Sequence, residues 1–196
     1  SGSGKSTVVQ AMMRILPPPA LINGGKVFIN NQDIMTASPS DIIKFRWKQI
    51  SIVMQSALNA LNPVLSIREQ INDVLVTHSG LTGGDANDRA EELLSLVDLD
   101  PQRLDGYPHQ LSGGMKQRVV IAIALAIMPP IIIMDEPTTA LDVIVEREII
   151  SKIIELRKKL GFTILFITHD LNLLLEFVDR LAIMKNGEIV ELDGVV

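Results

Sequence analysis

Residues 111–118 read Leu-Ser-Gly-Gly-Met-Lys-Gln-Arg and carry the most specific chemical signal of the chain. Ser112 is a good helix N-cap, because its hydroxyl accepts a hydrogen bond from a backbone N–H one turn on. Gly113 and Gly114 let backbone donors approach a phosphate with no Cβ in the way. A helix over 115–128 would direct its positive end at the same point. Taken alone, such a turn is more often the structural start of a buried helix, so its meaning depends on the other motifs.

Residues 1–7, Ser-Gly-Ser-Gly-Lys-Ser-Thr, match the second half of the phosphate-loop pattern G-x-x-x-x-G-K-[ST]. In that pattern backbone N–H groups surround the phosphates, the lysine reaches the β/γ oxygens and a hydroxyl binds Mg²⁺. The candidate nucleotide-binding residues are Gly2, Ser3, Gly4, Lys5, Ser6 and Thr7, and Ser6 is also a candidate Mg²⁺ ligand. The first glycine of the pattern would precede Ser1, so we expect the sequence to be a piece that begins inside the motif.

Two carboxylates follow the apolar run at 131–134, which is typical of a central parallel strand. Asp135 can hold Mg²⁺ through water, and Glu136 can orient or deprotonate an attacking water. Paired acids after a strand could instead cap the next helix, but the lysine loop favours the catalytic interpretation. Ligands bind beyond the carboxyl ends of the strands in open α/β sheets, which is where these acids lie.

Two further strand ends carry candidate residues. His169 follows the run at 162–167 and could bridge a γ-phosphate and the attacking water. Gln55 follows the run at 49–54, and its amide could bind Mg²⁺ or contact the attacking water, although a glutamine alone is weak evidence. His78 and His109 are interpreted as ordinary loop residues.

The elements that must position these residues alternate between strand and helix. Helices are expected over 8–16, where three prolines end the helix, and along an apolar stripe at Ala90, Leu93, Leu94 and Val97. Another helical stripe is expected to end at Gly161 as a C-cap, and its apolar residues are Val145, Ile149, Ile153, Leu156 and Leu160. Asn186-Gly187 predicts a hairpin. The sequence therefore predicts a mostly parallel sheet with an antiparallel piece at each end and an inserted helical subdomain after Gln55.

Composition narrows the class of protein. The 196 residues, 47% of them hydrophobic, suffice for one α/β domain, and the net charge of −5 argues against duplex nucleic acid as the main partner. Without cysteine the chain has no disulfide framework or thiolate metal site. The apolar stretch 119–134 is cut by Pro129-Pro130 and is too short to span a bilayer. Two basic clusters are interpreted as solvated helix faces: Lys44, Arg46 and Lys48, and Arg157, Lys158 and Lys159.

Taken together, the motifs resemble the ATP-binding subunits of ABC transporters. Residues 1–7 match the Walker A loop, Gln55 the Q-loop, 111–118 the family signature, 131–136 Walker B, 140–142 the D-loop and His169 the switch histidine. Finer strings at 16–19, 61–63, 107–110 and 138–143, with Met115 in the signature, resemble the oligopeptide/dipeptide and nickel importer branch. Ser56, Ala57 and Ala60 depart from that branch, in a segment expected to face the membrane subunit.

The resemblance implies a P-loop NTPase of ABC type, with residues 1–54 and 119–196 forming a RecA-like core plus β subdomain and 55–118 the helical subdomain. It implies ATP and Mg²⁺ as ligands, catalytic roles for Glu136, His169 and Gln55, metal contacts from Ser6, Gln55 and Asp135, and nucleotide contacts from Asp142. Ser112, Gly113 and Gly114 would complete the ATP site of a second ATPase subunit in a head-to-tail homo- or heterodimer.

The activity so implied is ATP hydrolysis that powers import of a solute, most simply oligopeptides or dipeptides. Its partners would be integral permease subunits and, indirectly, an extracytoplasmic solute-binding protein, with the chain at the cytoplasmic face of the cell membrane. One alternative is a soluble ABC-type ATPase acting on ribosomes or DNA, although the 107 residues from Lys5 to Ser112 show no sustained heptads. Another is an inactive module that, as a fragment, binds ATP weakly and aggregates.

Overall fold

The computed structural model describes residues 2–55, 59–139 and 141–194. Sequence predictions that fall on Ser1, Ser56, Ala57 and Ala140 lie outside these described residues. The chain divides into two compact units: unit 1 is Ser1–Arg46 with Ile167–Val196, and unit 2 is Trp47–Phe166. Unit 2 is therefore inserted in sequence between the two parts of unit 1.

The first helix of unit 1, α1 (Lys5–Met12), starts and ends earlier than the predicted 8–16. It starts earlier because the left-handed Gly4 (φ 91°) turns the chain directly into the helix, and Arg14 (φ 53°) turns the chain just after it. The Arg46 guanidinium donates to the Met13 oxygen at 2.8 and 3.1 Å and to the Arg14 oxygen at 2.8 Å. Arg46 thus binds carbonyls beyond the helix end, so its prediction as a solvated residue was wrong. Burial and the charge of Arg14 lower the pKa of Arg46.

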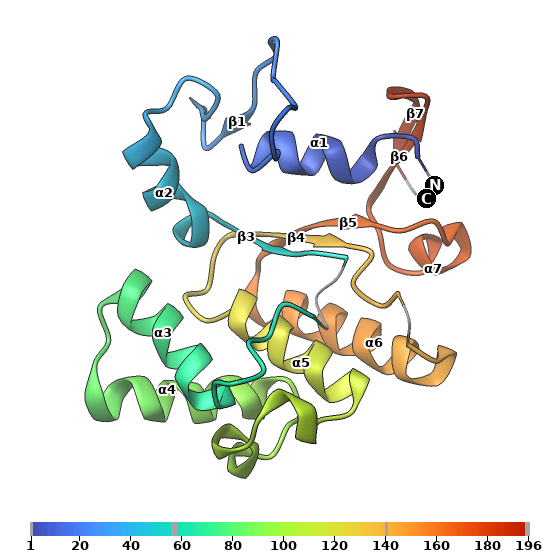
Figure 1. Ribbon diagram of the computed structural model, residues 1–196. Helices are drawn as coiled ribbons and strands as arrows, with labels where there is room; N and C mark the ends of the chain where they lie inside the picture. The colour runs from blue at the N-terminus through green and yellow to red at the C-terminus, as the bar shows by residue number, and fades with distance from the viewer. Residues whose placement is uncertain (1, 56–58, 140, 195–196) are drawn as a thin grey trace. The chain divides into compact units, whose positions relative to one another are not determined.

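The other elements of unit 1 are β1 (Phe28–Ile29), β2 (Gln32–Asp33), α2 (Pro39–Lys48), α7 (Leu171–Leu175), β6 (Arg180–Lys185) and β7 (Glu188–Gly194) (Figure 1). The last two residues of α2 belong to unit 2. β1 pairs antiparallel with β2, and β6 pairs antiparallel with β7. Asn186 and Gly187 both have positive φ, 52° and 84°, which is the requirement of a type I′ hairpin turn. The two antiparallel pieces and the Asn-Gly hairpin are therefore confirmed.

Unit 2 is built on the sheet β3 (Ile50–Val53), β4 (Ile131–Asp135) and β5 (Thr163–Ile167), in the order β3-β4-β5. β5 ends at the first residue of the second part of unit 1. β3 and β4 are parallel, with Ile50 opposite Ile131 and Val53 opposite Met134. Because β3 and β4 run parallel and are paired from Ile50 to Val53, the residues that follow both strands lie at the same edge of the sheet.

Unit 2 also contains these helices and 3₁₀ turns: α3 (Ile67–Ser79), α4 (Gly83–Leu96), η2 (Pro101–Asp105), η3 (Pro108–Gln110), α5 (Gly113–Ala124) and α6 (Val143–Leu160). Figure 1 shows α5 and α6 along one face of the sheet, with α3 and α4 beside α5. Their buried faces form one core, to which these residues contribute: Ile67, Ile71, Ala90, Leu93, Leu94, Val97, Val119, Ile132, Met134, Ile149 and Ile153. The mixed α/β fold with a parallel sheet is as predicted.

Local capping explains where these helices begin and end. Ser66 and Glu69 form a capping box at the start of α3, and Gly161 (φ 77°) ends α6 in the left-handed conformation, as predicted. His78 lies in the last turn of α3, where its ring stacks on Trp47 with centroids 5.1 Å apart. The prediction of His78 as a loop residue was therefore wrong.

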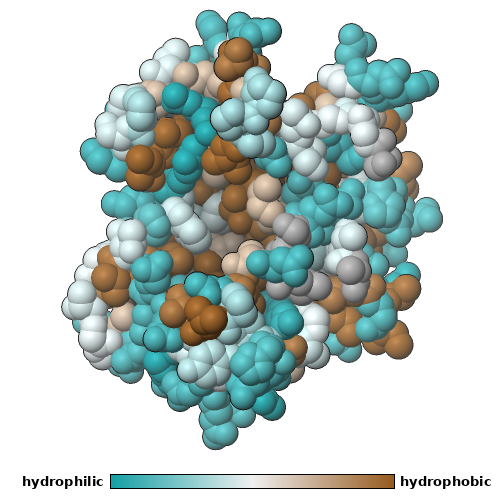
Figure 2. All heavy atoms as spheres, viewed as in Figure 1, coloured by the Kyte–Doolittle hydropathy of each residue, from teal (hydrophilic) through white to brown (hydrophobic). Residues whose placement is uncertain are grey.

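On the surface of unit 2, hydrophobic side chains gather where α6 begins (Figure 2). Val143 and Ile144, the first two residues of α6, are 68% and 73% exposed. Among the described residues, no helix combines the length and the apolarity needed to cross a membrane.

Candidate functional site

The phosphate loop (residues 1–7) runs into the first turn of α1 in unit 1. Gly2 and Gly4 have φ 83° and 91°, a conformation in which a side chain is strained, so both positions need glycine. The Ser3 carbonyl accepts a hydrogen bond from Gly187 of the β6–β7 hairpin at 3.1 Å, which ties the loop to that hairpin. Lys5 lies in the first helical turn, whose backbone N–H groups have no intrahelical acceptor. The loop therefore leads into backbone N–H groups that have no intrahelical acceptor, with a lysine beside them, and such an arrangement suits an anion.

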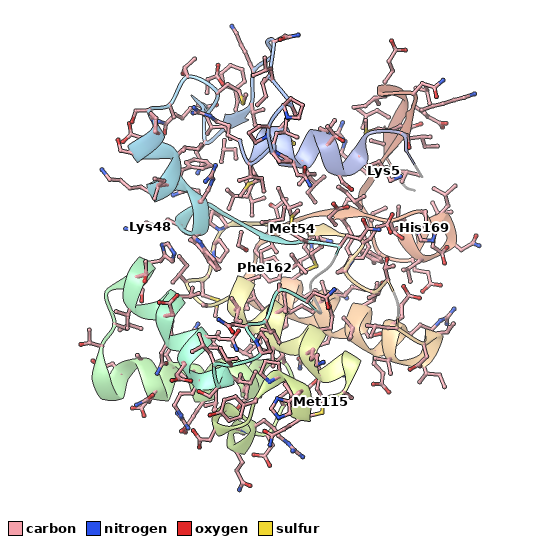
Figure 3. The ribbon with its side chains drawn as sticks, viewed as in Figure 1. Lys5, Lys48, Met54, Met115, Phe162 and His169 are labelled. Carbon is pink, nitrogen blue, oxygen red and sulfur yellow. The ribbon has the colours of Figure 1, made fainter. Side chains whose placement is uncertain are left out.

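His169 lies between β5 and α7, also in unit 1. The strand ends at Ile167, so the prediction that His169 follows a strand is confirmed. The residues on either side hold the local backbone: the Asp170 N–H donates to the Thr168 hydroxyl, and the Asp170 carboxylate caps α7 by accepting from Leu173, both at 3.1 Å. Figure 3 shows Lys5 at the start of α1 and His169 ahead of α7.

The predicted carboxylate pair stands at the end of β4 in unit 2. Asp135 is the last residue of the strand and is 1% exposed, while Glu136 follows with φ 46°. A left-handed conformation costs a non-glycine residue about 1–2 kcal/mol, so it persists only where neighbouring groups hold it. The structure brings Gln55 to this carboxylate, because its Nε2 donates to Glu136 Oε2 at 2.9 Å. Thr139 Oγ1 donates to the same oxygen at 3.1 Å.

These hydrogen bonds determine what Gln55 can offer a metal. A carboxylate only accepts, so the amide nitrogen of Gln55 faces Glu136 and its oxygen is the atom with metal-binding capacity. The predicted metal ligands, Ser6, Gln55 and Asp135, supply a hydroxyl, an amide oxygen and a carboxylate. Such hard oxygen donors fit Mg²⁺. Within the described ranges no three His, Cys, Asp or Glu residues gather as a metal cluster.

The signature turn (residues 112–114) opens α5 in unit 2. Ser112 is the N-cap, and its hydroxyl accepts from the Met115 N–H at 3.3 Å, which confirms the predicted cap. The helix runs from Gly113 to Ala124 and is therefore shifted toward the N-terminus relative to the predicted 115–128. Figure 3 labels Met115 in this first turn. The helix has twelve residues, which is enough to give its start the partial positive charge of a helix dipole.

Asp142, predicted to contact nucleotide, caps α6. Its carboxylate accepts from the backbone N–H groups of Ile144 at 3.1 Å and Val145 at 3.0 Å. Two backbone hydrogen bonds form turns after Glu136. The Thr139 N–H donates to the Glu136 carbonyl, and the Leu141 N–H donates to the Thr138 carbonyl. Among the candidate residues of unit 2, Glu136 and Asp142 therefore lie on the same stretch of chain, which leads into α6.

Sequence reasoning missed one residue of this site. Thr139 donates to the carboxylate of Glu136, which was predicted to be catalytic. From the sequence, Thr139 was noted only within residues 138–143, which resemble the peptide and nickel importer branch. The available signal was its spacing, since a threonine three residues after Glu136 in a turn can reach back to that side chain.

Comparison with known proteins gives a consistent result. The sequence model of the ABC transporter family matches residues 1–139. The chain is 42% identical over 193 residues to the dipeptide transport ATP-binding protein DppD of Caldanaerobacter subterraneus, covering 97% of the chain and 59% of that protein. It is 42% identical over 194 residues to the oligopeptide transport ATP-binding protein OppD of Bacillus subtilis, covering 97% of the chain and 54% of that protein. The chain thus spans little more than half the length of these relatives.

A solved structure is similar over the whole chain. It is the dimeric post-hydrolysis state of the ATP-binding cassette MJ0796 bound to ADP and Pi, with a TM-score of 0.83 and 33% sequence identity. The match covers 100% of the chain and 82% of that cassette.

Proposed function

The chain belongs to the ABC transporter family, and from this premise we propose that it is the ATP-hydrolysing subunit that powers import of a solute through a membrane permease. One observation carries the proposal. Glu136 stands at the end of β4 in a left-handed conformation, and Gln55 and Thr139 both donate to its carboxylate. A carboxylate held in place after a buried strand is suited to orient and deprotonate an attacking water.

In the proposed reaction each group of this chain has a separate task. The backbone of the phosphate loop and Lys5 bind the β- and γ-phosphates, and Glu136 orients the attacking water and accepts its proton. His169 bridges the γ-phosphate and the attacking water. Mg²⁺, when bound by Ser6, Gln55 and Asp135, supplies positive charge to the phosphate oxygens. The strategy is positioning plus electrostatic stabilisation.

The signature turn would serve a second ATPase subunit, identical or closely related, in a head-to-tail dimer. Ser112, Gly113 and Gly114 would contact the γ-phosphate bound by the partner's phosphate loop, and Asp142 would lie at the same interface. The dimeric state of the similar cassette supports a dimer. Further support comes from Val143 and Ile144, whose exposed apolar side chains adjoin Asp142 and suit burial against a partner.

Peptides are the proposed cargo class, because the similar proteins carry the names dipeptide and oligopeptide transport ATP-binding protein. The subunit would then act at the cytoplasmic face of the membrane, against integral permease subunits that receive solute from an extracytoplasmic binding protein. We assign the permease contact to the helical subdomain (residues 55–118), and residues 1–54 and 119–196 to the catalytic core with its β subdomain.

Replacement of Glu136 tests the catalytic assignment. Glu136→Gln should lower ATP turnover by about 10²–10⁴-fold, the usual contribution of a general base, while MgATP affinity stays within about threefold. Exposed Glu188→Gln is the matched control and should change neither quantity. Phosphate release and equilibrium binding of MgATP give the two measurements. Turnover that survives Glu136→Gln would remove this residue from its proposed role.

Lys5→Ala tests the loop in the same assays. Because Lys5 is proposed to contact the bound phosphates directly, its loss should weaken MgATP binding at least about tenfold. An unchanged affinity would argue against the phosphate-loop assignment. A chain that binds and hydrolyses ATP normally but purifies with ribosomes instead of membranes would contradict the transport half of the proposal.

A further inference from the structure

The two glycines of the signature turn have different surroundings. A Cβ built on Gly114 would lie 2.6 Å from Val145 Cγ1, closer than real Cβ atoms approach a neighbour. A Cβ built on Gly113 would lie 3.3 Å from Leu141 Cδ2, the far end of a side chain that can turn aside. The backbone of the first turn of α5 therefore rests directly on Val145 of the same chain.

Backbone conformation does not explain the glycine at position 114. Gly114 is the second residue of α5 and is absent from the residues with positive φ. Alanine is a better helix former than glycine. The reason for glycine at position 114 is therefore steric, because Val145 occupies the space that a Cβ would need.

Val145 is itself held in place. Its backbone N–H donates to Asp142 Oδ1 at 3.0 Å in the first turn of α6. Valine in a helix occupies one strongly preferred rotamer, so Cγ1 cannot swing away at low cost. Val145 is also partly buried against the core of unit 2. Its position is thereby fixed relative to Asp142.

We propose that Val145 is a positioning residue for the signature turn, and that position 114 is glycine because Val145 fills the space of its Cβ. The contact fixes how closely α5 approaches the 141–145 segment and hence where the N–H groups of residues 112–114 point. This inference rests on the proposed function of the signature turn as part of an ATP site. Glycine is then required at position 114 by packing within the chain, rather than by close approach of the nucleotide.

A double-mutant cycle in the complete subunit tests the proposal. Gly114→Ala should lower the ATP turnover number at least about tenfold, with a smaller change in KM, because overpacking displaces the turn rather than the phosphate loop. Adding Val145→Ala removes Cγ1 and leaves its Cβ at 3.9 Å, an ordinary contact distance. Turnover of the double variant should return to within about threefold of Val145→Ala alone.

Gly113→Ala with and without Val145→Ala is the matched control, and Val145→Ala should give it no rescue. Thermal unfolding is measured for every variant, and the same pattern of rescue is expected in Tm. If Gly114→Ala does not fold, a folded double variant supports the contact and an unfolded one overturns it. A double variant that regains Tm but not turnover would overturn the proposal, since the nucleotide would then need the glycine. If the parent subunit lacks ATPase activity, the proposed function fails, while the Tm cycle still decides the contact.

Discussion

The carboxylate of Asp98 joins three helices of unit 2, and its neutralisation gives a quantitative test of the packing around the signature helix. Asp98 follows α4, its Oδ1 lies 2.8 Å from Lys152 Nζ of α6, and its Oδ2 lies 3.6 Å from Arg118 Nη1 of α5. Arg118 also donates to the Val97 carbonyl at 2.9 Å. Because Asp98 has φ 56°, asparagine is the suitable replacement: it tolerates this conformation and keeps the shape.

The stability that Asp98→Asn should remove depends on how exposed the paired side chains are. Exposed ion pairs contribute about 0.2–1 kcal/mol each. Asp98 is 58% exposed, but the side chains of Lys152 and Arg118 are only 14% and 16% exposed, which places both pairs in the upper half of that range. The two pairs together therefore predict a loss of about 1.2–2 kcal/mol in the free energy of unfolding. In a chain of this size that corresponds to a fall in Tm of about 2–8 °C.

The assay is urea denaturation with thermal unfolding, at low and at 1 M salt. Asp73→Asn, the same change at an exposed position of α3, is the control and should cost less than about 0.5 kcal/mol. The Asp98→Asn cost should shrink at 1 M salt, because the Debye length falls to about 3 Å. A cost equal to that of the control, or one that salt leaves unchanged, would refute the electrostatic reasoning.

Three further outcomes are expected. Gln55→Ala and Thr139→Val should each lower ATP turnover about tenfold, since both side chains donate to Glu136, and only Gln55→Ala, which also removes a proposed Mg²⁺ ligand, should weaken MgATP binding; normal turnover in both variants would contradict this. Arg46→Lys should lower the free energy of unfolding by about 1–2 kcal/mol, because an ammonium cannot reproduce three guanidinium hydrogen bonds; urea denaturation that matches the parent would count against it. Burial lowers the pKa of Lys152, but its hydrogen bonds to Asp98 and Glu155 outweigh that effect and the pKa is raised. The stability difference between the parent and Lys152→Met should therefore be complete below about pH 10.4 and disappear as the pH rises through the raised pKa, and a difference independent of pH would refute this.

Local patterns predicted most of the fold because they act over a few residues. The apolar stripe at Ala90, Leu93 and Leu94, the Gly161 cap and the Asn-Gly hairpin each depend on neighbours in sequence, and all are confirmed. The start of α1 was misplaced because the left-handed Gly4 extends the helix back to the phosphate loop. Sequence pattern does not state where a positive φ will fall.

Long-range contacts were the part that the sequence could not supply. Arg46 reaches the Met13 carbonyl 33 residues away, and nothing in a basic cluster distinguishes such an arginine from a solvated one. Val145 was predicted only as part of a helical stripe, and its contact with Gly114 emerges when α5 and α6 are packed together. Residue types thus predicted the chemistry of the site, whereas its steric constraints required the three-dimensional packing.

A mixing experiment shows whether the signature turn of one chain completes the ATP site of another. In the Glu136→Gln background, one chain carries Lys5→Ala and a differently tagged chain carries Ser112→Arg. Each alone should fail to dimerise with MgATP, whereas the mixture should pair, because one site then combines an intact loop with an intact turn from the other chain. If the Ser112→Arg chain dimerises alone as well as its Glu136→Gln parent, or if the mixture never pairs, the claim is contradicted.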